Sequence, residues 1–314
     1  MLVRNDKPAP SLGTVLIRFK GEEPPQNVID VEPYELFNAL MAGSLLVIDV
    51  RPAVEFRAGA LPRSINVEIS DSDGSIESVV EGLAERERML LRRRRVMDVV
   101  VISKTGTQDA SDPARKFASL VPDSLSVSVL QGGYDGFAAL YPFAMEKNYP
   151  LPWYPTIVLD DFLYLGGESD ARNLKNLEDL NISRILNVSS EVKNLYPDKF
   201  EYMQINVDDD PSCKIDKHFP KAFKFLDKAF EDKKRVLVHC FEGLTTLGVS
   251  RSSTIVIAYL MQRQNWNLYE TGMFLKGQRL LVQPNPGFRK QLGSYENRLC
   301  GVSTLNEAIR DLFT

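Results

Sequence analysis

The amino-acid sequence predicts an α/β fold in which helices cover both faces of a central, mostly parallel sheet. Short buried strands alternate with segments of helical spacing along nearly the whole chain, and this order is typical of parallel sheets. The length of 314 residues predicts about two such domains. The composition, 44% apolar and 25% charged, is that of a globular protein and excludes a disordered chain, a collagen-like chain and a disulfide scaffold.

A proline-rich leader precedes the first domain. Residues 1–26 contain four prolines and scattered charges, and we expect them to be poorly ordered. The first domain is expected over residues 27–147, where helical spacing of apolar residues and short β-branched runs predict its elements. The expected helices are 33–41, 53–58, 75–95 and 114–120, the expected strands are 45–50, 65–69, 99–102 and 127–130, and Gly132-Gly133 is expected to form a turn.

The second domain is expected over residues 156–300. Three prolines in eight residues mark residues 148–155 as a linker before it. Thr304 and Glu307 have the spacing of a capping box, which predicts a last helix within residues 301–314 that ends at about residue 312. The expected strands are 157–165, 184–188, 202–207 and 236–239, and the expected helices are 171–180, 219–230, 252–262 and 268–275.

The charge and cysteine content exclude several classes of protein. The 38 Lys and Arg against 42 Asp and Glu residues give a net charge of −4, which does not suggest a nucleic-acid binder. Three cysteines are too few for a secreted disulfide framework, and two histidines exclude a metal site built on three or more of them. The longest apolar stretch, at residues 255–261, is far below the ~18 residues of a membrane span, and the first residues do not resemble a secretory signal. We therefore expect a protein without metal or other cofactor that acts in the cytoplasm, with the nucleus as a second compartment, and not at a membrane.

The segment with the sharpest chemical signal is VLVHCFEGLTTLGVSRSSTIVIAYLM, residues 236–261. A buried strand ends at His239 and Cys240, a loop with two glycines follows, and Arg251 and Ser252 open an apolar helix. The amides at a helix N-terminus and the guanidinium of Arg251 attract an anion such as phosphate. In this field Cys240 is expected to have a depressed pKa and to act as a thiolate nucleophile. The alternative is a buried cysteine at a strand end and an arginine on the surface.

This segment resembles the HCxxGxxRS signature of the protein-tyrosine phosphatases, and among them the dual-specificity family most closely. Removing five residues turns it into HCFEGVSRSSTIVIAYLM, which matches the signature fully. The resemblance extends over about residues 153–299. Residues 161–190 are similar to the opening strand, helix and strand of the family, INVDDDPSCKIDKHFPKAFKF to its general-acid loop, and residues 282–299 to its closing helix. It implies the cysteine-phosphatase fold and a two-step hydrolysis of phosphoproteins on tyrosine and on serine or threonine.

The resemblance also implies a role for the residues of the signature. Cys240 would attack phosphorus, and Arg251 would stabilise the equatorial oxygens. Asp209 would protonate the leaving oxygen and then activate the water that hydrolyses the phosphocysteine. Ser252 would assist the departing thiolate, and His239 would orient the loop.

The phosphate would also be held by the backbone of the loop. The residues concerned, together with Arg251, are Gly243, Gly248, Val249 and Ser250. Asp208 and Asp210 are close enough in sequence to replace Asp209 as the acid. Without the resemblance to the phosphatases, the acidic run at residues 208–210 would be interpreted as a solvated loop. His218 is expected to have no chemical role.

The loop between Cys240 and Arg251 is longer than in the family, with ten residues where the family has five. Misplacing reacting atoms by ~1 Å can cost around 100-fold in rate. In the favoured register the strand ends at Cys240 and five residues bulge out. In the other register Thr245 replaces the nucleophile, but the strand must then shift by five residues, which reverses the faces of its side chains. A third explanation is an artefact of splicing or of the gene model. Because five extra residues in the phosphate loop would impair turnover, the alternative function is a pseudophosphatase that acts as a phosphoprotein-binding scaffold in signalling.

Residues 31–143 resemble a rhodanese-like domain. The resemblance rests on Asp49, Arg51, Gly59 and the Gly-Gly-Tyr turn at residues 132–134. Sulfur transfer needs a cysteine after the strand at residues 99–102, and Ser103 stands there instead, so we expect no sulfurtransferase activity. A rhodanese-like domain without its cysteine before a dual-specificity domain is the arrangement of the mitogen-activated protein kinase phosphatases. It is also that of the serine/threonine/tyrosine-interacting-like pseudophosphatase.

Four consecutive arginines suggest a docking site for a kinase. In the kinase phosphatases the first domain binds the kinase through an arginine cluster, although not directly before a strand as in this chain. Basic residues followed by spaced apolar ones suit an acidic groove. The alternative is a solvated helix end whose arginines meet the helix dipole. The expected partners are a phosphorylated protein substrate and, as a candidate, a mitogen-activated protein kinase that docks on Arg92, Arg93, Arg94 and Arg95.

Overall fold

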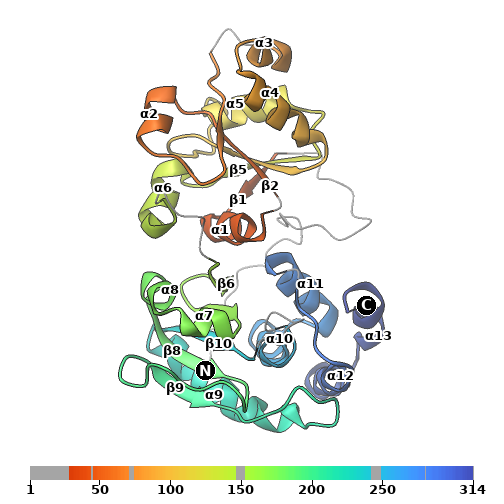
Figure 1. Ribbon diagram of the computed structural model, residues 1–314. Coiled ribbons are helices and arrows are strands. Elements are labelled where there is room, and N and C mark those ends of the chain that lie inside the picture. The colour runs from red at the N-terminus through yellow and green to blue at the C-terminus, as the bar shows by residue number, and fades with distance from the viewer. Residues whose placement is uncertain are drawn as a thin grey trace. The chain divides into compact units, whose positions relative to one another are not determined.

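The computed structural model describes residues 28–43, 45–70, 74–145, 153–241, 249–279 and 281–313. The chain divides into two compact units, an N-terminal unit that ends at Pro152 and a C-terminal unit that begins at Trp153 (Figure 1). Each unit combines helices with a five-stranded sheet, which confirms the predicted fold class. The predicted leader at residues 1–26 and residues 148–152 of the predicted linker lie outside the described residues.

The N-terminal unit contains a parallel sheet with the strand order β1-β5-β4-β2-β3. Its strands are β1 (Ile29–Val31), β2 (Leu45–Asp49), β3 (Ile65–Asn66), β4 (Asp98–Ile102) and β5 (Ser126–Leu130). Its helices are α1 (Pro33–Ala42), α2 (Ala53–Ala58), α3 (Ile76–Glu81), α4 (Glu85–Leu91), α5 (Pro113–Leu120) and α6 (Gly133–Leu140), with the 3-10 turns η1 (Arg92–Arg95) and η2 (Pro142–Met145). Helices α3, α4 and α5 lie on one side of the sheet, and α1 and α6 lie on the other (Figure 1).

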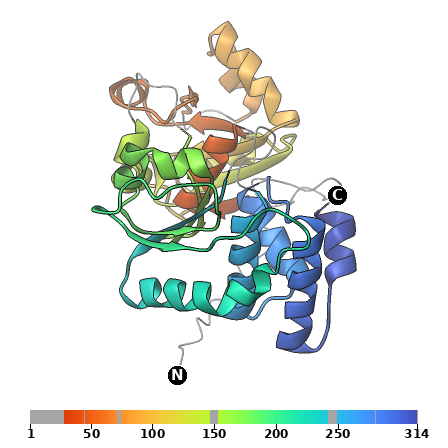
Figure 2. The same cartoon turned by 60° about the horizontal axis from the view of Figure 1, so that its bottom comes forward.

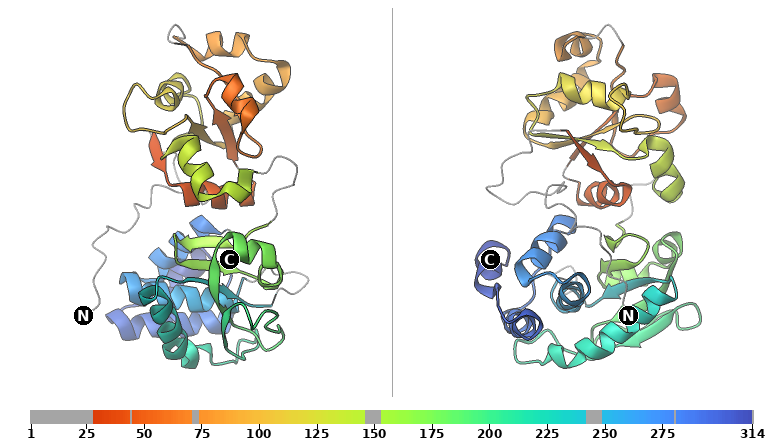
Figure 3. Two further views of the ribbon diagram at one scale, coloured as in Figure 1. Left: turned by 90° about the vertical axis from the view of Figure 1, so that its left-hand side faces the viewer. Right: turned by 180° about the vertical axis from the view of Figure 1, so that it is seen from behind.

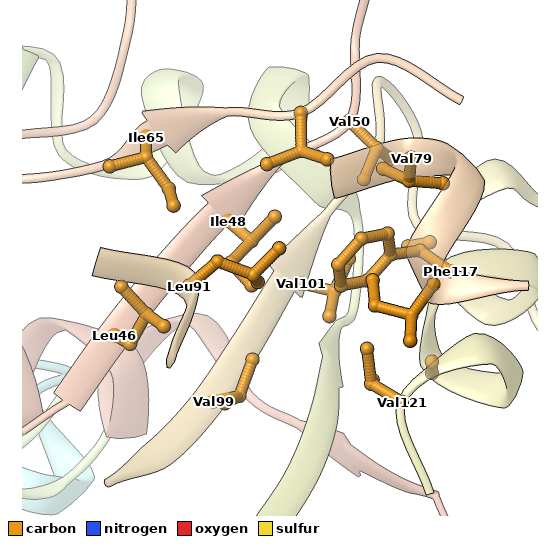
Figure 4. Packing of buried hydrophobic residues seen from close by; sticks show 14 of the residues in the cluster. Leu46, Ile48, Val50, Ile65, Val79, Leu91, Val99, Val101, Phe117 and Val121 are labelled. Atoms are coloured by element: carbon orange, nitrogen blue, oxygen red, sulfur yellow. The ribbon is translucent and has the colours of Figure 1, made fainter. Parts of the chain in front are cut away.

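One face of this sheet carries an apolar core. Successive side chains of a strand point to opposite sides, so alternate residues of β2 and β4 share a face. Leu46 and Ile48 of β2 lie on that face with Val101 of β4, and Phe117 of α5 packs in the same cluster (Figure 4). Burying one such side chain fully contributes ~1.5–3 kcal/mol to stability.

Residues 75–95 do not form the single helix that their spacing predicts. α3 ends at Glu81 with Gly82 as its C-cap, and α4 begins after Ala84, whose backbone is extended. On one straight helix the side chains of Val79 and Leu91 would point about 120° apart. The break between α3 and α4 allows both side chains to reach the same core. The sequence also did not predict β1 or α6, which begins at the second glycine of the predicted turn.

Asp49 and Arg51 form a buried ion pair at the end of β2. The guanidinium of Arg51 donates to the Asp49 carboxylate from Nε at 3.0 Å and from Nη2 at 2.7 Å. Nη2 also donates to the Gly59 carbonyl at 2.7 Å, and the guanidinium carbon lies 3.5 Å from the centre of the Tyr134 ring. The residues on which the rhodanese resemblance rests thus form one cluster.

Replacing Arg51 by alanine should destabilise the N-terminal unit by ~3–5 kcal/mol, because the buried carboxylate of Asp49 loses its partner. Hydrogen exchange at the amides of β2 and β4 in the full chain measures the free energy of opening of this unit. Arg92→Ala removes an exposed arginine and is the control, with no expected change. A cost for Arg51→Ala below ~1 kcal/mol, as for a surface pair, would contradict a structural role.

The C-terminal unit contains the sheet β6-β7-β10-β8-β9, in which β6 is antiparallel to β7 and the other pairs are parallel. Its strands are β6 (Thr156–Leu159), β7 (Leu163–Gly166), β8 (Ile182–Asn187), β9 (Glu201–Gln204) and β10 (Arg235–His239). Its helices are α7 (Glu168–Arg172), α8 (Leu174–Asp179), α9 (Phe219–Glu231), α10 (Arg251–Gln264), α11 (Leu268–Gln278), α12 (Pro286–Cys300) and α13 (Leu305–Asp311), with η3 (Ile215–His218) before α9. Helices α10 to α13 form one group, coloured blue (Figures 2 and 3).

Three predicted elements of this unit differ from the structure. The strand predicted at residues 157–165 is a hairpin of β6 and β7, and Asp161, with φ of 57°, reverses the chain. The helix predicted at residues 171–180 is divided at Asn173, whose side chain caps α8. The predicted capping box does not form, because the Thr304 hydroxyl donates instead to the buried Glu296 at 2.8 Å. Among the helices of the described residues, none has the length and apolar composition of a membrane span.

Candidate active site

Cys240 directly follows β10 at the carboxyl edge of the parallel strands. His239 of β10 pairs with Gly166 of β7 and with Asn187 of β8, so the ends of these three strands meet at one edge. In open α/β sheets this edge is the usual place of a ligand site. The strand has the favoured register, with Cys240 at its end and no shift of five residues.

Part of the predicted phosphate loop lies outside the described residues. These residues include Gly243, Gly248 and Thr245. The described ends of the loop are Cys240 and Phe241 on one side and Val249 onward on the other. Within the described ranges, no group of three or more His, Cys, Asp or Glu side chains could hold a metal ion.

The side chain of Cys240 is buried and faces the first turn of α10. Its Sγ lies 3.3 Å from the hydroxyl oxygen of Ser252. Burial raises the pKa of the Cys240 thiol, while hydrogen bonds with Ser252 and the charge of Arg251 act to lower it. The expectation of a depressed pKa is therefore wrong for this arrangement. Cys240 is 1% exposed, and the loss of hydration outweighs the neighbouring dipoles and the charge of Arg251.

The side chain of Arg251 is 2% exposed, so it is not the surface charge of the alternative interpretation. Nη1 donates to Oε2 of Glu191 at 2.6 Å and to the carbonyl of Val207 at 3.0 Å. Partial burial opposes ionisation of Glu191, but the bond from Arg251 holds the pKa of Glu191 below its usual range. Nε of Arg251 is buried and has no hydrogen-bond partner among the described residues. Because an unsatisfied buried donor is costly, this group is suited to an oxygen of a bound anion.

Asp209 is the aspartate of the acidic run that contacts the end of the phosphate loop. Its Oδ1 accepts a hydrogen bond from the Ser250 hydroxyl at 2.7 Å and another from Nδ2 of Asn285 at 2.8 Å. Its negative charge also reaches Cys240, where it acts to raise the thiol pKa. Asp209 is thus held beside the candidate nucleophile.

The two neighbouring aspartates have other partners. Asp208 accepts a hydrogen bond from the Ser190 hydroxyl. Asp210 accepts the backbone N–H of Ser212 at 2.7 Å, and hydrogen bonds from Ser212 lower the pKa of this exposed carboxyl. Of the three aspartates, the described contacts thus place Asp209 against the end of the phosphate loop, while Asp208 and Asp210 bond other groups.

The segment at residues 283–285, which the resemblance included in the closing helix, precedes α12 and holds the end of the phosphate loop. The carbonyl of Val249 accepts the backbone N–H of Gln283 at 2.8 Å, and the Ser250 hydroxyl accepts that of Asn285 at 3.1 Å. Asn285 also caps α12, because its Oδ1 accepts the N–H of Phe288 at 2.9 Å. An asparagine followed by proline is a helix-start signal, but this signal does not reveal contacts across the fold.

His239 is buried at the end of β10. Burial lowers the pKa of His239 to about 4, although a hydrogen bond with the Cys240 backbone acts in the opposite direction. Nδ1 has no hydrogen-bond partner among the described residues. The imidazole is therefore neutral at physiological pH and acts at most as an uncharged support. His218, the last residue of η3, is half-buried.

The arginine run in the N-terminal unit is not uniform. Arg94 is buried and donates to the Asp123 carboxylate from Nε at 3.0 Å and from Nη2 at 2.8 Å. Arg95 is exposed but donates to the same carboxylate at 2.8 Å. Arg92 and Arg93 are exposed. Arg94 is therefore a structural residue, and a docking surface can use only the other three.

Ser103, which occupies the position of the sulfur-carrying cysteine in the rhodanese resemblance, directly follows β4. It is buried, and its hydroxyl donates to Oδ2 of Asp112 at 3.0 Å. The same hydroxyl accepts the backbone N–H of Gly106 at 3.0 Å. The serine thus closes its own loop with hydrogen bonds.

Comparison with known families gives two matches. The model of the dual specificity phosphatase catalytic domain matches residues 163–298, and that of the rhodanese-like domain matches residues 27–140. A probable rhodanese domain-containing dual specificity protein phosphatase of Dictyostelium discoideum is 34% identical over 183 residues, which are 55% of this chain and 37% of that protein. The chain thus spans well under half of that relative.

Two further proteins are similar over larger shares of their length. The dual specificity protein phosphatase 4 of Homo sapiens is 30% identical over 306 residues, which are 85% of this chain and 76% of that protein. Among solved structures, the crystal structure of DUSP15 is 32% identical and matches 51% of this chain and 97% of its own, with a TM-score of 0.43.

Acid should destabilise the C-terminal unit through His239. Below pH 6.5 the unfolded chain takes up a proton on this residue, whereas the folded chain does so only near pH 4, so stability falls as the pH falls between these values. The free energy of unfolding should drop by about 2 kcal/mol from pH 7 to pH 5 on this account. Denaturant titrations at both pH values should show a smaller drop for His239→Gln. His218→Gln is the matched control and should keep the native drop; an equal drop in all three proteins would contradict the argument.

Proposed function

Because the chain belongs to the dual specificity protein phosphatase family and carries a rhodanese-like domain, we propose that it hydrolyses phosphotyrosine and phosphoserine or phosphothreonine in proteins. The observation that carries this proposal is the gathering of three groups at one edge of the sheet. The Cys240 thiol lies within electrostatic reach of both Arg251 and Asp209. Cys240 would supply the nucleophile, Arg251 the cation for the phosphate and Asp209 the carboxyl group for the leaving oxygen.

In the first step Cys240, as the thiolate, attacks phosphorus with its sulfur. The S–P bond forms as the P–O bond to the substrate breaks, and Asp209 gives its proton to the departing oxygen. Arg251 contributes through Nε, the buried donor without a partner, while its Nη1 stays on Glu191 and Val207. The ion pair with Glu191 thereby fixes the plane of the guanidinium before the phosphate arrives.

In the second step water attacks the phosphocysteine. Asp209, now a carboxylate, takes the proton of the water, and the S–P bond breaks. The leaving group is the Cys240 thiolate, which burial disfavours. The Ser252 hydroxyl, 3.3 Å from Sγ, can donate a hydrogen bond to that developing charge.

A second candidate function is a pseudophosphatase that binds phosphoproteins without turnover. Two observations favour it. The loop between Cys240 and Arg251 has ten residues, where the signature has five. Burial also raises the pKa of the Cys240 thiol, so less of the nucleophile is ionised in this arrangement. In this candidate Arg251 and Ser250 would hold the phosphate, and the protein would protect or recruit its phosphorylated partner.

Purified protein should hydrolyse an aryl phosphate, and Cys240→Ser should lower the rate by at least ~1,000-fold, because serine at this position is a far weaker nucleophile. Phosphate release measures the rate. Cys300→Ser, at an exposed cysteine at the end of α12, is the matched control and should keep full activity.

The same assay separates the two candidate functions. A variant without residues 243–247 has the loop length of the signature. No turnover by the native chain, with turnover in this deletion variant and binding of a phosphotyrosine peptide by both, would establish the pseudophosphatase. Turnover that persists in Cys240→Ser would overturn the proposed mechanism.

We also propose that Arg92 and Arg93 contribute to docking of a mitogen-activated protein kinase on the N-terminal unit. Both side chains are exposed, and Val96, close behind them in the chain, is 74% exposed. Basic side chains beside an exposed apolar one suit an acidic groove with an apolar pocket. Arg94 contributes nothing directly, since Asp123 holds it.

Reversing the charge at both positions, with Arg92→Glu and Arg93→Glu, should weaken binding of a purified mitogen-activated protein kinase at least ~10-fold. The effect should shrink as salt is raised, because exposed charges are screened. The control is Arg57→Glu with Lys116→Glu, which makes the same change of net charge at exposed positions outside the run. Equal weakening by both pairs, or none by either, would contradict docking at the run.

A further inference from the structure

We propose that the first two turns of α12 hold the general-acid loop in position, and that Gly287 and Gln291 are positioning residues for Asp209. This inference rests on the proposed function, because it assigns to α12 a task in the protonation of the leaving group. Neither residue contacts the phosphate loop in the described structure. Their partners are Pro211, Cys213 and Asp216, which follow Asp209 along the chain.

Gly287 allows the acid loop to approach the backbone of α12. A Cβ built at this glycine would lie 1.9 Å from the carbonyl oxygen of Pro211 and 2.6 Å from its Cα. These are backbone atoms, which cannot turn aside as a flexible side chain can. Gly287 has no positive φ, so the requirement is for space and not for an unusual conformation. Any side chain here must push Pro211, and with it the neighbouring Asp209, away from the helix.

Gln291 holds the loop one turn further along the helix. Its Nε2 donates to the carbonyl of Cys213 at 2.8 Å, and its Oε1 accepts the backbone N–H of Asp216 at 3.1 Å. The amide of this single side chain thus closes the turn between Cys213 and η3. Gln291 is 9% exposed, so little water is available to replace either bond. Two hydrogen bonds to backbone groups fix the path of the loop more strictly than contacts between side chains would.

The contacts follow the same order on the loop and on the helix. Asn285 bonds Asp209, Gly287 packs on Pro211, and Gln291 bonds residues 213 and 216. The loop therefore lies along the start of α12 from the acid onward. Among the described residues, Asp209 accepts hydrogen bonds from Ser250 and Asn285, and both fall on Oδ1. Oδ2 is then the oxygen left for the leaving group, and its direction depends on the path of the loop.

If α12 holds the acid loop, variants of Gly287 and Gln291 should lose more activity on a substrate with a poor leaving group than on one with a good leaving group. Gln291→Met keeps the volume of the side chain and removes both of its hydrogen bonds to the acid loop, and Gly287→Ala adds one methyl group against Pro211. Either variant should lower kcat/KM, which reports the first step, by ~10-fold or more for phenyl phosphate, whose phenol is a poor leaving group that needs the acid. For 4-nitrophenyl phosphate, whose leaving group needs little protonation, kcat/KM should fall less than ~3-fold. The alkaline limb of the pH–rate profile for phenyl phosphate should flatten as well.

Two variants at sites that do not contact the acid loop serve as controls. Ser294→Ala, on the exposed side of α12, and Gly136→Ala, a helical glycine with open space at its Cβ position, should leave both rates unchanged. Hydrogen exchange over residues 208–218 of the full chain should be faster in Gln291→Met and native in Ser294→Ala. An equal loss on both substrates, no loss in either variant, or unchanged exchange would overturn the inference. If the native chain has no turnover at all, the proposed function fails, and the exchange experiment still decides whether α12 holds the loop.

Discussion

The contact between the end of β10 and the first turn of α10 is the constraint on which the site depends. It brings the Cys240 sulfur to 3.3 Å from the Ser252 hydroxyl, although ten residues separate Cys240 from Arg251. The parallel pairing of β10 with β7 and β8 determines where the strand ends, and the packing of α10 in the helical group determines where the helix begins. Because both ends are anchored by the fold, extra loop residues need not displace the nucleophile from its cation.

The same burial that brings these groups together also limits their chemistry. Removing Cys240 from water disfavours the thiolate, and the dipoles and charge around it do not compensate fully. Arg251 meets the opposite situation, since Glu191 and the Val207 carbonyl satisfy Nη1 while Nε is left without a partner. A bound phosphate would accept a hydrogen bond from Nε and would place negative charge beside the guanidinium of Arg251. Arg251 therefore has a buried donor suited to an anion, whereas burial disfavours the ionised form of Cys240.

Helix α12 connects the two loops that the proposed reaction must coordinate. Its cap, Asn285, donates to Asp209 from the side-chain amide and to the Ser250 hydroxyl from the backbone N–H, so one residue joins Asp209 to the end of the phosphate loop. Gly287 and Gln291 then bind the remainder of the acid loop. One helix with its cap therefore contacts both loops, which is the preorganisation that the proposed reaction would require.

The sequence by itself determined the fold class, the family and the order of most elements, because local periodicity and the signature around Cys240 are properties of neighbouring residues. It did not predict the break at Gly82–Ala84 or the competition of Glu296 for Thr304, since each depends on a partner distant in the chain. Only the tertiary structure shows that Arg94 is buried against Asp123 and that Asp209, unlike its two neighbours, contacts Ser250. Side chains of the same type in one run are distinguished only by what they contact. It also reversed the expected pKa shift of Cys240. Burial is a sum over all packed elements, and no local pattern records it.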